Sequence, residues 1–91
     1  MIRVFVVYEQ VPDSDRYEQH VEFCRKVPNA VFRHGPITRT FAGEELAYYA
    51  EFEFADEDAY KNAVKSDEFR ATGGDAQAMG VPHRIYVTEI K

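Results

Sequence analysis

A histidine and a tyrosine three residues apart are the side chains of this sequence best suited to proton-transfer chemistry. Tyr17, His20, Val21, Cys24 and Val27 recur at helical spacing, which predicts the buried stripe of an amphipathic helix. A histidine on such a stripe costs free energy unless it is hydrogen-bonded, and imidazole titrates near neutral pH. His20 is therefore a candidate general acid/base at the mouth of a pocket between helix and sheet. The competing interpretation is a core histidine satisfied by a tyrosine or a backbone carbonyl.

Further candidate ligand-binding groups lie on two predicted strands. Arg33 and His34 are adjacent on one strand, so alternation places them on opposite sheet faces. Tyr48 and Tyr49 divide between the faces in the same way. An arginine could bind a carboxylate or phenolate, and a tyrosine could donate a proton or form an aromatic wall. Alternatively, Arg33 pairs with a strand glutamate across a dimer, and the tyrosines are packing residues, as is common on strands.

Other signals predict no metal and no cofactor. The three histidines lack metal-ligand spacing, and Cys24 is the one thiol in the chain. Cys24 lies on the buried helical stripe, where burial raises a thiol pKa and a free cysteine usually packs. Gly73-Gly74 lacks the lysine and the second spaced glycine of a phosphate loop. His83 follows a proline, and we expect it to be solvated.

These groups must be positioned by elements in the order β-α-β-β-α-β. Residues 2–9 are rich in β-branched and aromatic side chains and predict a strand covered on both faces. Either Asp13 or Asp15 caps the first helix. Residues 30–41 predict an edge strand with a bulge, because Gly35-Pro36 interrupts them. A strand follows from Ala47 to Phe54.

The remainder of the chain predicts a second helix and a closing strand. Asp56 caps the helix, whose inner face is expected to carry Ala59, Tyr60, Ala63 and Val64. Ser66 could cap a further short turn of helix. Residues 72–75 and 80–82 then break the chain before a last strand over residues 84–91. No linker or repeat divides the sequence, so residues 1–91 form one domain.

Composition limits the partners and the compartment. A net charge of −5 and a pI near 5.1 disfavour nucleic acid and anionic membrane surfaces. RNA-recognition domains share this element order, but their basic and stacking positions are occupied here by Ala47 and Glu51. The first twelve residues read as a strand rather than a signal peptide, and the lone cysteine closes no disulfide. We expect a cytoplasmic protein.

The predicted topology leaves one sheet face without a cover. Two helices occupy one face of the four-stranded antiparallel sheet, while Phe5 and Val7 lie on the other. An exposed apolar sheet face usually marks an interface. We therefore predict a homodimer in which two sheets pack face to face as a dimeric α+β barrel. The alternative is a monomer with one open, aromatic face.

Soft patterns of aromatic and small residues give the sequence a family resemblance. The chain resembles the EthD-like proteins over most of its length, through Ile2–Tyr8, the Pro12-Asp13 turn, Tyr17 with His20, Pro28-Asn29, Tyr48–Phe54, Asp56, Ala59-Tyr60, Ala63-Val64 and Ser66. The resemblance implies a ferredoxin-like dimeric α+β barrel. His20 matches the histidine that this family carries on its first helix. Where the family often has a second histidine, this chain has Cys24 and Arg25, and it lacks the tryptophan of the haem-degrading branch.

The resemblance also implies a class of function. Members are associated with the breakdown or tailoring of small organic compounds; the namesake accompanies an ether-degrading cytochrome system, and fungal relatives are dehydratases or decarboxylases of polyketide pathways. One hypothesis is a cofactor-independent enzyme acting on an aromatic or polyketide-like compound, with His20 as acid/base and Tyr17, Arg33, His34, Tyr48 and Tyr49 as binding groups. The other is a non-catalytic homodimer that binds a small molecule or supports an oxidative degradation system.

Overall fold

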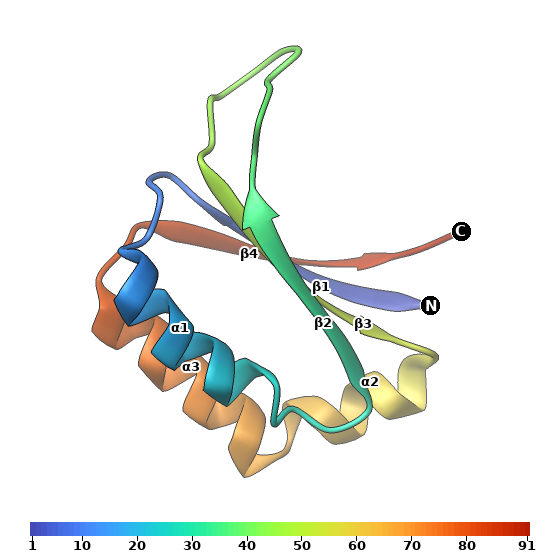
Figure 1. Ribbon diagram of the computed structural model, residues 1–91. Coiled ribbons are helices and arrows are strands. Elements are labelled where there is room, and N and C mark those ends of the chain that lie inside the picture. The colour runs from blue at the N-terminus through green and yellow to red at the C-terminus, as the bar shows by residue number, and fades with distance from the viewer.

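A four-stranded antiparallel sheet carries all of the helices on one face (Figure 1). The computed structural model describes residues 1–91, and its elements are β1 (Ile2–Tyr8), α1 (Ser14–Cys24), β2 (Ala30–Pro36), β3 (Tyr48–Phe54), α2 (Glu57–Val64), α3 (Asp67–Met79) and β4 (His83–Glu89). The strand order is β2-β3-β1-β4. This ferredoxin-like arrangement confirms the fold class predicted from the sequence.

The core lies between the helices and the inner face of the central strands. In the register of β1 with β3, Ile2 lies opposite Phe54 and Tyr8 lies opposite Tyr48. Even-numbered residues of both strands therefore face the helices, and Val4, Val6, Ala50, Phe52 and Phe54 are all buried there. Alternation along these strands predicted this division correctly.

The first helix has the buried stripe that the sequence predicted. Tyr17, His20, Val21 and Cys24 are its buried residues. Of the two possible caps, Asp13 is the one used: its carboxylate accepts a hydrogen bond from the Arg16 backbone N–H at 3.0 Å. The helix therefore begins at Ser14, two residues earlier than a cap at Asp15 would place its start.

The segment predicted as a short turn and a glycine break is instead a third helix. α3 spans thirteen residues and runs through Gly73-Gly74, lying beside α1 in Figure 1. Each glycine inside a helix costs about 1 kcal/mol. Ser66 offsets part of this cost by capping the helix, and Gly80 ends it in the left-handed conformation, with φ of 72°. Packing against α1 contributes the rest. None of the helices has the length and apolar character needed to cross a membrane.

The β2 strand is an edge strand, as predicted, but it is shorter and more regular than expected. It ends at Pro36, and its pairing with β3 runs without a bulge from Ala30 opposite Phe54 to Pro36 opposite Tyr48. Proline is tolerated because it lies at the end of an edge strand. Residues 37–47 then form a long connection that extends away from the sheet (Figure 1), and Phe41 within it is 97% exposed.

The sheet face away from the helices is open and mixed in character. Phe5 stacks with Tyr49, with ring centroids 5.9 Å apart. Arg33 pairs with Glu51 at 3.2 Å and with Glu53 at 3.3 Å within the same chain. Aromatic packing therefore lies beside a small ion-pair network on this face.

Candidate functional site

His20 is held by a carboxylate from a neighbouring helix. Its side chain lies on the sheet-facing side of α1 and only 2% of the residue is exposed. The ring Nδ1 is 2.8 Å from Oδ2 of Asp75, which lies on α3. Antiparallel packing of the two helices (Figure 1) brings these residues together across 55 positions of sequence. The site therefore depends on the part of α3 that the sequence predicted as a break.

A second partner fixes Asp75 in place. The guanidinium of Arg16, one turn before His20, donates two hydrogen bonds to this carboxylate, at 2.8 and 3.2 Å. These bonds, followed by that of His20, hold the pKa of Asp75 below its ordinary value against the opposing effect of burial. Asp75 is thus an anionic acceptor, and the Nδ1–H of a neutral His20 donates to it.

Burial keeps His20 in its neutral form near pH 7. Desolvation lowers the pKa of His20, and this effect exceeds the opposing contribution of Asp75. With the proton on Nδ1, the second nitrogen, Nε2, carries a lone pair, and the one side-chain hydrogen bond of His20 is that of Nδ1. A neutral imidazole with a fixed tautomer and a free Nε2 has the protonation state of a general base.

His20 lines a small cavity between the sheet and helices α1 and α3. The cavity volume is about 70 Å³, which is well below the roughly 300 Å³ at the lower end of ligand sites but sufficient for water. Its walls are mainly apolar and are formed by Val4, Val6, Tyr8, His20, Cys24, Ala50, Phe52, Phe69, Thr72, Gly73, Ala76, His83 and Ile85. Burial raises the pKa of the Cys24 thiol to about 12, so this cysteine is a packing residue with no thiolate character.

His83 also belongs to this cavity, which corrects the expectation that it is solvated. It lies at the start of β4, paired in register with Tyr8, and its ring centroid is 5.7 Å from that of Tyr8. Its Nδ1 is 2.8 Å from the carbonyl oxygen of Val81. The residue is partly buried because β4 lies beside β1 at the cavity wall.

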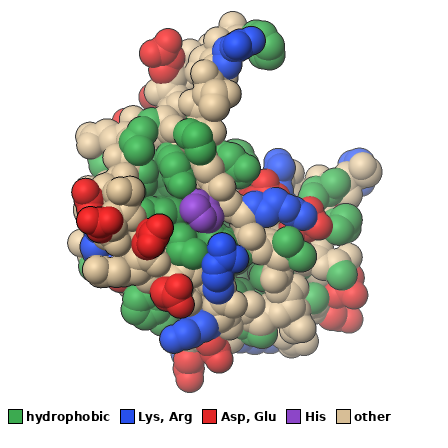
Figure 2. Space-filling model, in the orientation of Figure 1, with side chains coloured by type: hydrophobic (Ala, Val, Ile, Leu, Met, Phe, Trp, Pro, Cys, Tyr) green, Lys and Arg blue, Asp and Glu red, His purple; other side chains and the backbone are tan.

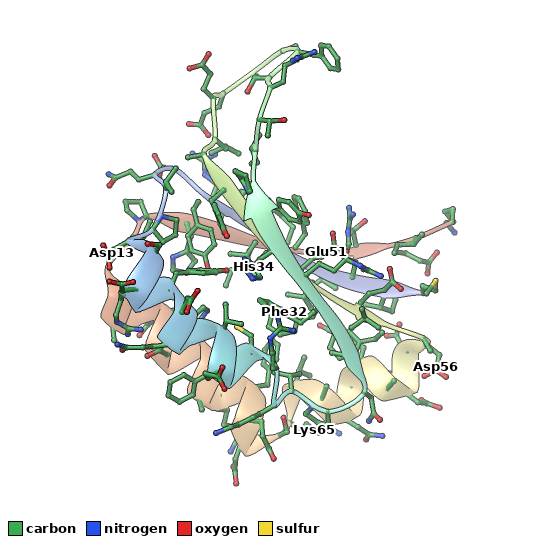
Figure 3. The ribbon with its side chains drawn as sticks, in the orientation of Figure 1. Asp13, Phe32, His34, Glu51, Asp56 and Lys65 are labelled. Atoms are coloured by element: carbon green, nitrogen blue, oxygen red, sulfur yellow. The ribbon has the colours of Figure 1, made fainter.

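Three of the predicted binding residues gather at a second, outer cleft between α1 and β2. Tyr17, His34 and Tyr48 line one hollow of about 160 Å³. His34 and Glu18 also line an adjoining hollow of about 250 Å³ along α1. Figure 3 places His34 between α1 and β2, and in the same orientation Figure 2 shows a histidine at the centre of a mainly hydrophobic surface.

Tyr17 lies between His20 and the His34 side of the outer cleft. Its ring centroid lies 5.5 Å from that of His20 and 5.3 Å from that of His34. Across the cleft, Nδ1 of His34 is 2.7 Å from the hydroxyl oxygen of Tyr48. Burial lowers the pKa of His34 and raises that of Tyr48, so both groups are neutral near pH 7.

Arg33 and Tyr49 are not part of this site. Both lie on the open face of the sheet, because they alternate with His34 and Tyr48 on the same strands. Arg33 makes its ion pairs there with strand glutamates of its own chain. The expectation that either residue would share a pocket with His20 is corrected accordingly.

Asp75 and Arg16 are the site residues that sequence reasoning missed. Asp75 was assigned to the break over residues 72–75, and Arg16 lies outside the buried stripe that the helical spacing predicted. One signal could have found the pair: Arg16 and His20 are four residues apart, so both lie on one side of α1 and can reach a single carboxylate.

Solved structures with the same fold are similar to this chain over nearly its whole length. An EthD-family protein from Bacillus halodurans C-125 matches with a TM-score of 0.80 and 22% identity, covering 100% of this chain and 99% of its own. A dimeric ferredoxin-like protein of unknown function from Jannaschia sp. CCS1 matches with a TM-score of 0.75 and 19% identity, covering 98% of each chain. SnoaB, a cofactor-independent oxygenase from Streptomyces nogalater, matches with a TM-score of 0.58 and 15% identity, covering 99% of this chain and 90% of its own.

These similarities establish the class of structure. No protein-family model matches the sequence, and no curated protein matches it. The chain has the ferredoxin-like fold shared by an EthD-family protein and by proteins described as dimeric, and this is the fold that its resemblance to EthD-like proteins implied.

Proposed function

We propose that this protein binds a small aromatic or polyketide-like compound and acts on it by cofactor-independent proton transfer, with His20 as the general base. One observation carries the proposal. His20 is buried beside a cavity, its Nδ1 is fixed by Asp75, and its Nε2 makes no side-chain hydrogen bond within the chain. A histidine with a purely structural role needs only hydrogen-bond partners for its ring nitrogens. Here a carboxylate that is itself held by Arg16 determines which ring nitrogen can accept a proton.

The aromatic residues around His20 support this choice of substrate class. Tyr17 lies in edge contact with Tyr8 and Tyr48, and its ring adjoins both His20 and His34. Flat, mainly apolar ligands suit such walls, and the few polar groups would fix their orientation. The oxygenase SnoaB shows that a protein of this fold can act without a cofactor.

We further propose that the protein works as a homodimer formed through the open sheet face. Phe5 and Tyr49 stack on that face, Tyr86 is half exposed beside them, and neighbours with this fold are described as dimeric. An apolar patch flanked by charged residues is typical of an interface between subunits.

The second candidate function is a non-catalytic binding or accessory protein, and the size of the cavity favours it. At about 70 Å³, the space beside His20 is smaller than a substrate of this class requires without movement of its walls. In that case the outer cleft binds the ligand, and the hydrogen bond to Asp75 serves only to satisfy His20.

A screen followed by isotope exchange separates the two functions. Phenolic and polyketide-like compounds are tested by thermal shift, and each stabilising compound is incubated in D₂O and followed by NMR. Proton transfer predicts that the wild-type protein accelerates exchange at an acidic C–H position, and that His20→Gln binds the compound without doing so. Binding without accelerated exchange would support the accessory function. Equal exchange by both proteins would exclude His20 as the base.

A further inference from the structure

The connection between β2 and β3, residues 37–47, stands clear of the domain as an extended arm (Figure 1). A hydrogen bond from the Ile37 N–H to the Ala47 carbonyl oxygen, at 3.0 Å, closes its base. Beyond that bond the backbone of residues 38–46 makes no hydrogen bond within the chain, and residues 38–45 are all exposed. The arm therefore gains little from its own domain, although ordering it costs conformational entropy.

An aromatic side chain lies at the end of this arm. Phe41 is 97% exposed, the highest fraction among the large hydrophobic side chains of the chain. Figure 2 shows the arm projecting from the body of the molecule with a hydrophobic side chain at its tip. Burial of an aromatic ring stabilises association, and aromatic residues are enriched at protein interfaces. Phe41 thus has the character of a contact residue whose partner lies outside its own chain.

One ion pair shows on which side of the sheet the arm is held. The carboxylate of Glu44 accepts two hydrogen bonds from the guanidinium of Arg84, one of them from Nη2 to Oε2 at 3.2 Å. Arg84 lies opposite Val7 in the register of β1 with β4, and Val7 alternates with residues that face the helices. The arm is therefore tied to the open sheet face, which is the face proposed above as the dimer interface.

We propose that residues 37–47 form a dimerisation arm, which packs Phe41 against a second copy of the chain. The proposal rests on the homodimer of the proposed function and adds a second contact to it. A second copy fits because the arm borders the face through which the two subunits would meet. Two-fold symmetry then gives each subunit an arm that contacts its partner, so the contact is made twice.

The open face of a partner subunit lies within reach and offers apolar surface. Val31 on β2 is 52% exposed and Tyr86 on β4 is 51% exposed, and the register of both strands places them on the open face. Two sheets packed face to face lie about 10 Å apart. The segment from Pro36 to Phe41 can span up to about 17 Å when extended, which is enough to bring the ring onto the facing sheet.

The dissociation constant of the dimer provides the first test. Sedimentation velocity over a dilution series compares the wild type with Phe41→Ser and with a control, Phe23→Ser, whose ring is exposed on α1. We expect Phe41→Ser to weaken dimerisation about tenfold, the effect of losing one well-packed aromatic contact, and Phe23→Ser to leave it unchanged. Equal dissociation constants for all three proteins would overturn the proposal.

The stability of a monomeric variant shows whether Phe41 serves the fold instead. Phe5→Glu places a charge on the open face and provides the monomer. Adding Phe41→Ser to it should leave the melting temperature unchanged, because the ring is 97% exposed within its own chain. A fall of several degrees would show that the ring packs on its own domain, and would reject the arm as an intersubunit contact.

A spin label locates the contact between subunits. Phe41→Cys can carry a nitroxide, whereas Cys24 is 2% exposed and burial raises its pKa to about 12, so it does not compete for the label. The labelled variant is mixed with ¹⁵N-labelled wild type, so that only contacts between subunits broaden the amide signals. We expect broadening at the open face of β2 or β4 and none on α1. Broadening confined to the helices, or none in a mixture that sedimentation shows to be dimeric, would contradict the proposal.

The same measurements separate this inference from the proposed homodimer. A wild-type dimer that Phe5→Glu dissociates and Phe41→Ser does not would reject the arm and retain the sheet-face dimer. A monomeric wild type would exclude both. Neither result changes the exchange experiment that tests His20 as the base.

Discussion

Replacing Asp75 by alanine should remove the group that selects the tautomer of His20. In the native protein the Nδ1–H of His20 donates to this carboxylate over 2.8 Å, and the two side chains are only 3% and 13% exposed. After the substitution, the buried Nδ1–H has no acceptor, because His20 makes no other hydrogen bond in the structure. The proton can then move to Nε2, and this nitrogen would no longer be able to accept a proton from a ligand.

The magnitude follows from the burial of the pair. Leaving a buried donor unpaired costs about 1–3 kcal/mol, so we expect a coupling between His20 and Asp75 of about 2 kcal/mol. In a domain of this size, 1 kcal/mol changes the melting temperature by about 4–8 °C. The part of the Asp75→Ala effect that involves His20 should therefore lower the melting temperature by about 10 °C.

A double-mutant cycle measures this coupling directly. Urea unfolding at pH 7.5 is compared for the wild type, Asp75→Ala, His20→Phe and the double variant. Loss of the ion pair with Arg16 occurs in both variants that lack Asp75, so it cancels from the coupling energy. In parallel, ¹⁵N chemical shifts of the imidazole report which nitrogen carries the proton, and we expect the Nδ1–H form only when Asp75 is present.

Additive free energies, within about 0.5 kcal/mol, would refute the reasoning, because separate sites normally add to that accuracy. So would an unchanged tautomer in Asp75→Ala. Either result would mean that the buried imidazole is held by its packing and not by the carboxylate.

Three other predictions address the fold and its pH dependence. Phe5→Glu places a charge on the open sheet face and should give a monomer in sedimentation velocity. The control, Phe23→Glu on the exposed surface of α1, should leave the dimer intact. A dimer for both variants would exclude the sheet face as the interface. Gly74→Ala should raise the free energy of unfolding by about 0.5–1 kcal/mol in urea, because a Cβ there meets open space within a helix, and a loss would show that the glycine is required. Burial lowers the pKa of His20, so as the pH falls the unfolded chain binds this proton before the folded protein does, and the free energy of unfolding should decline below about pH 6.5. In His20→Phe the decline with pH should be smaller, reduced to the part contributed by His34. An equal decline in both proteins would contradict the predicted effect of His20.

The sequence by itself determined the order of the strands, the first helix and the burial of His20. Alternation of apolar residues identified the inner faces of β1 and β3, because successive side chains of a strand must point to opposite sides. Helical spacing placed Tyr17 and His20 on the buried side of α1. Both results depend only on the local period of the backbone.

Local patterns gave the wrong result where tertiary packing opposed them. Gly73-Gly74 weakens a helix, so residues 72–75 suggested a break; α3 forms because caps at Ser66 and Gly80 and packing on α1 outweigh that weakness. The extended appearance of residues 37–41 also failed to produce a longer β2, since the pairing with β3 stops at Pro36.

Only the tertiary structure decided which polar residues share a site. Asp75 reaches His20 across 55 residues, and His83 reaches the same cavity from β4, because helix packing and strand order bring distant segments together. No periodicity in a single sequence contains that information.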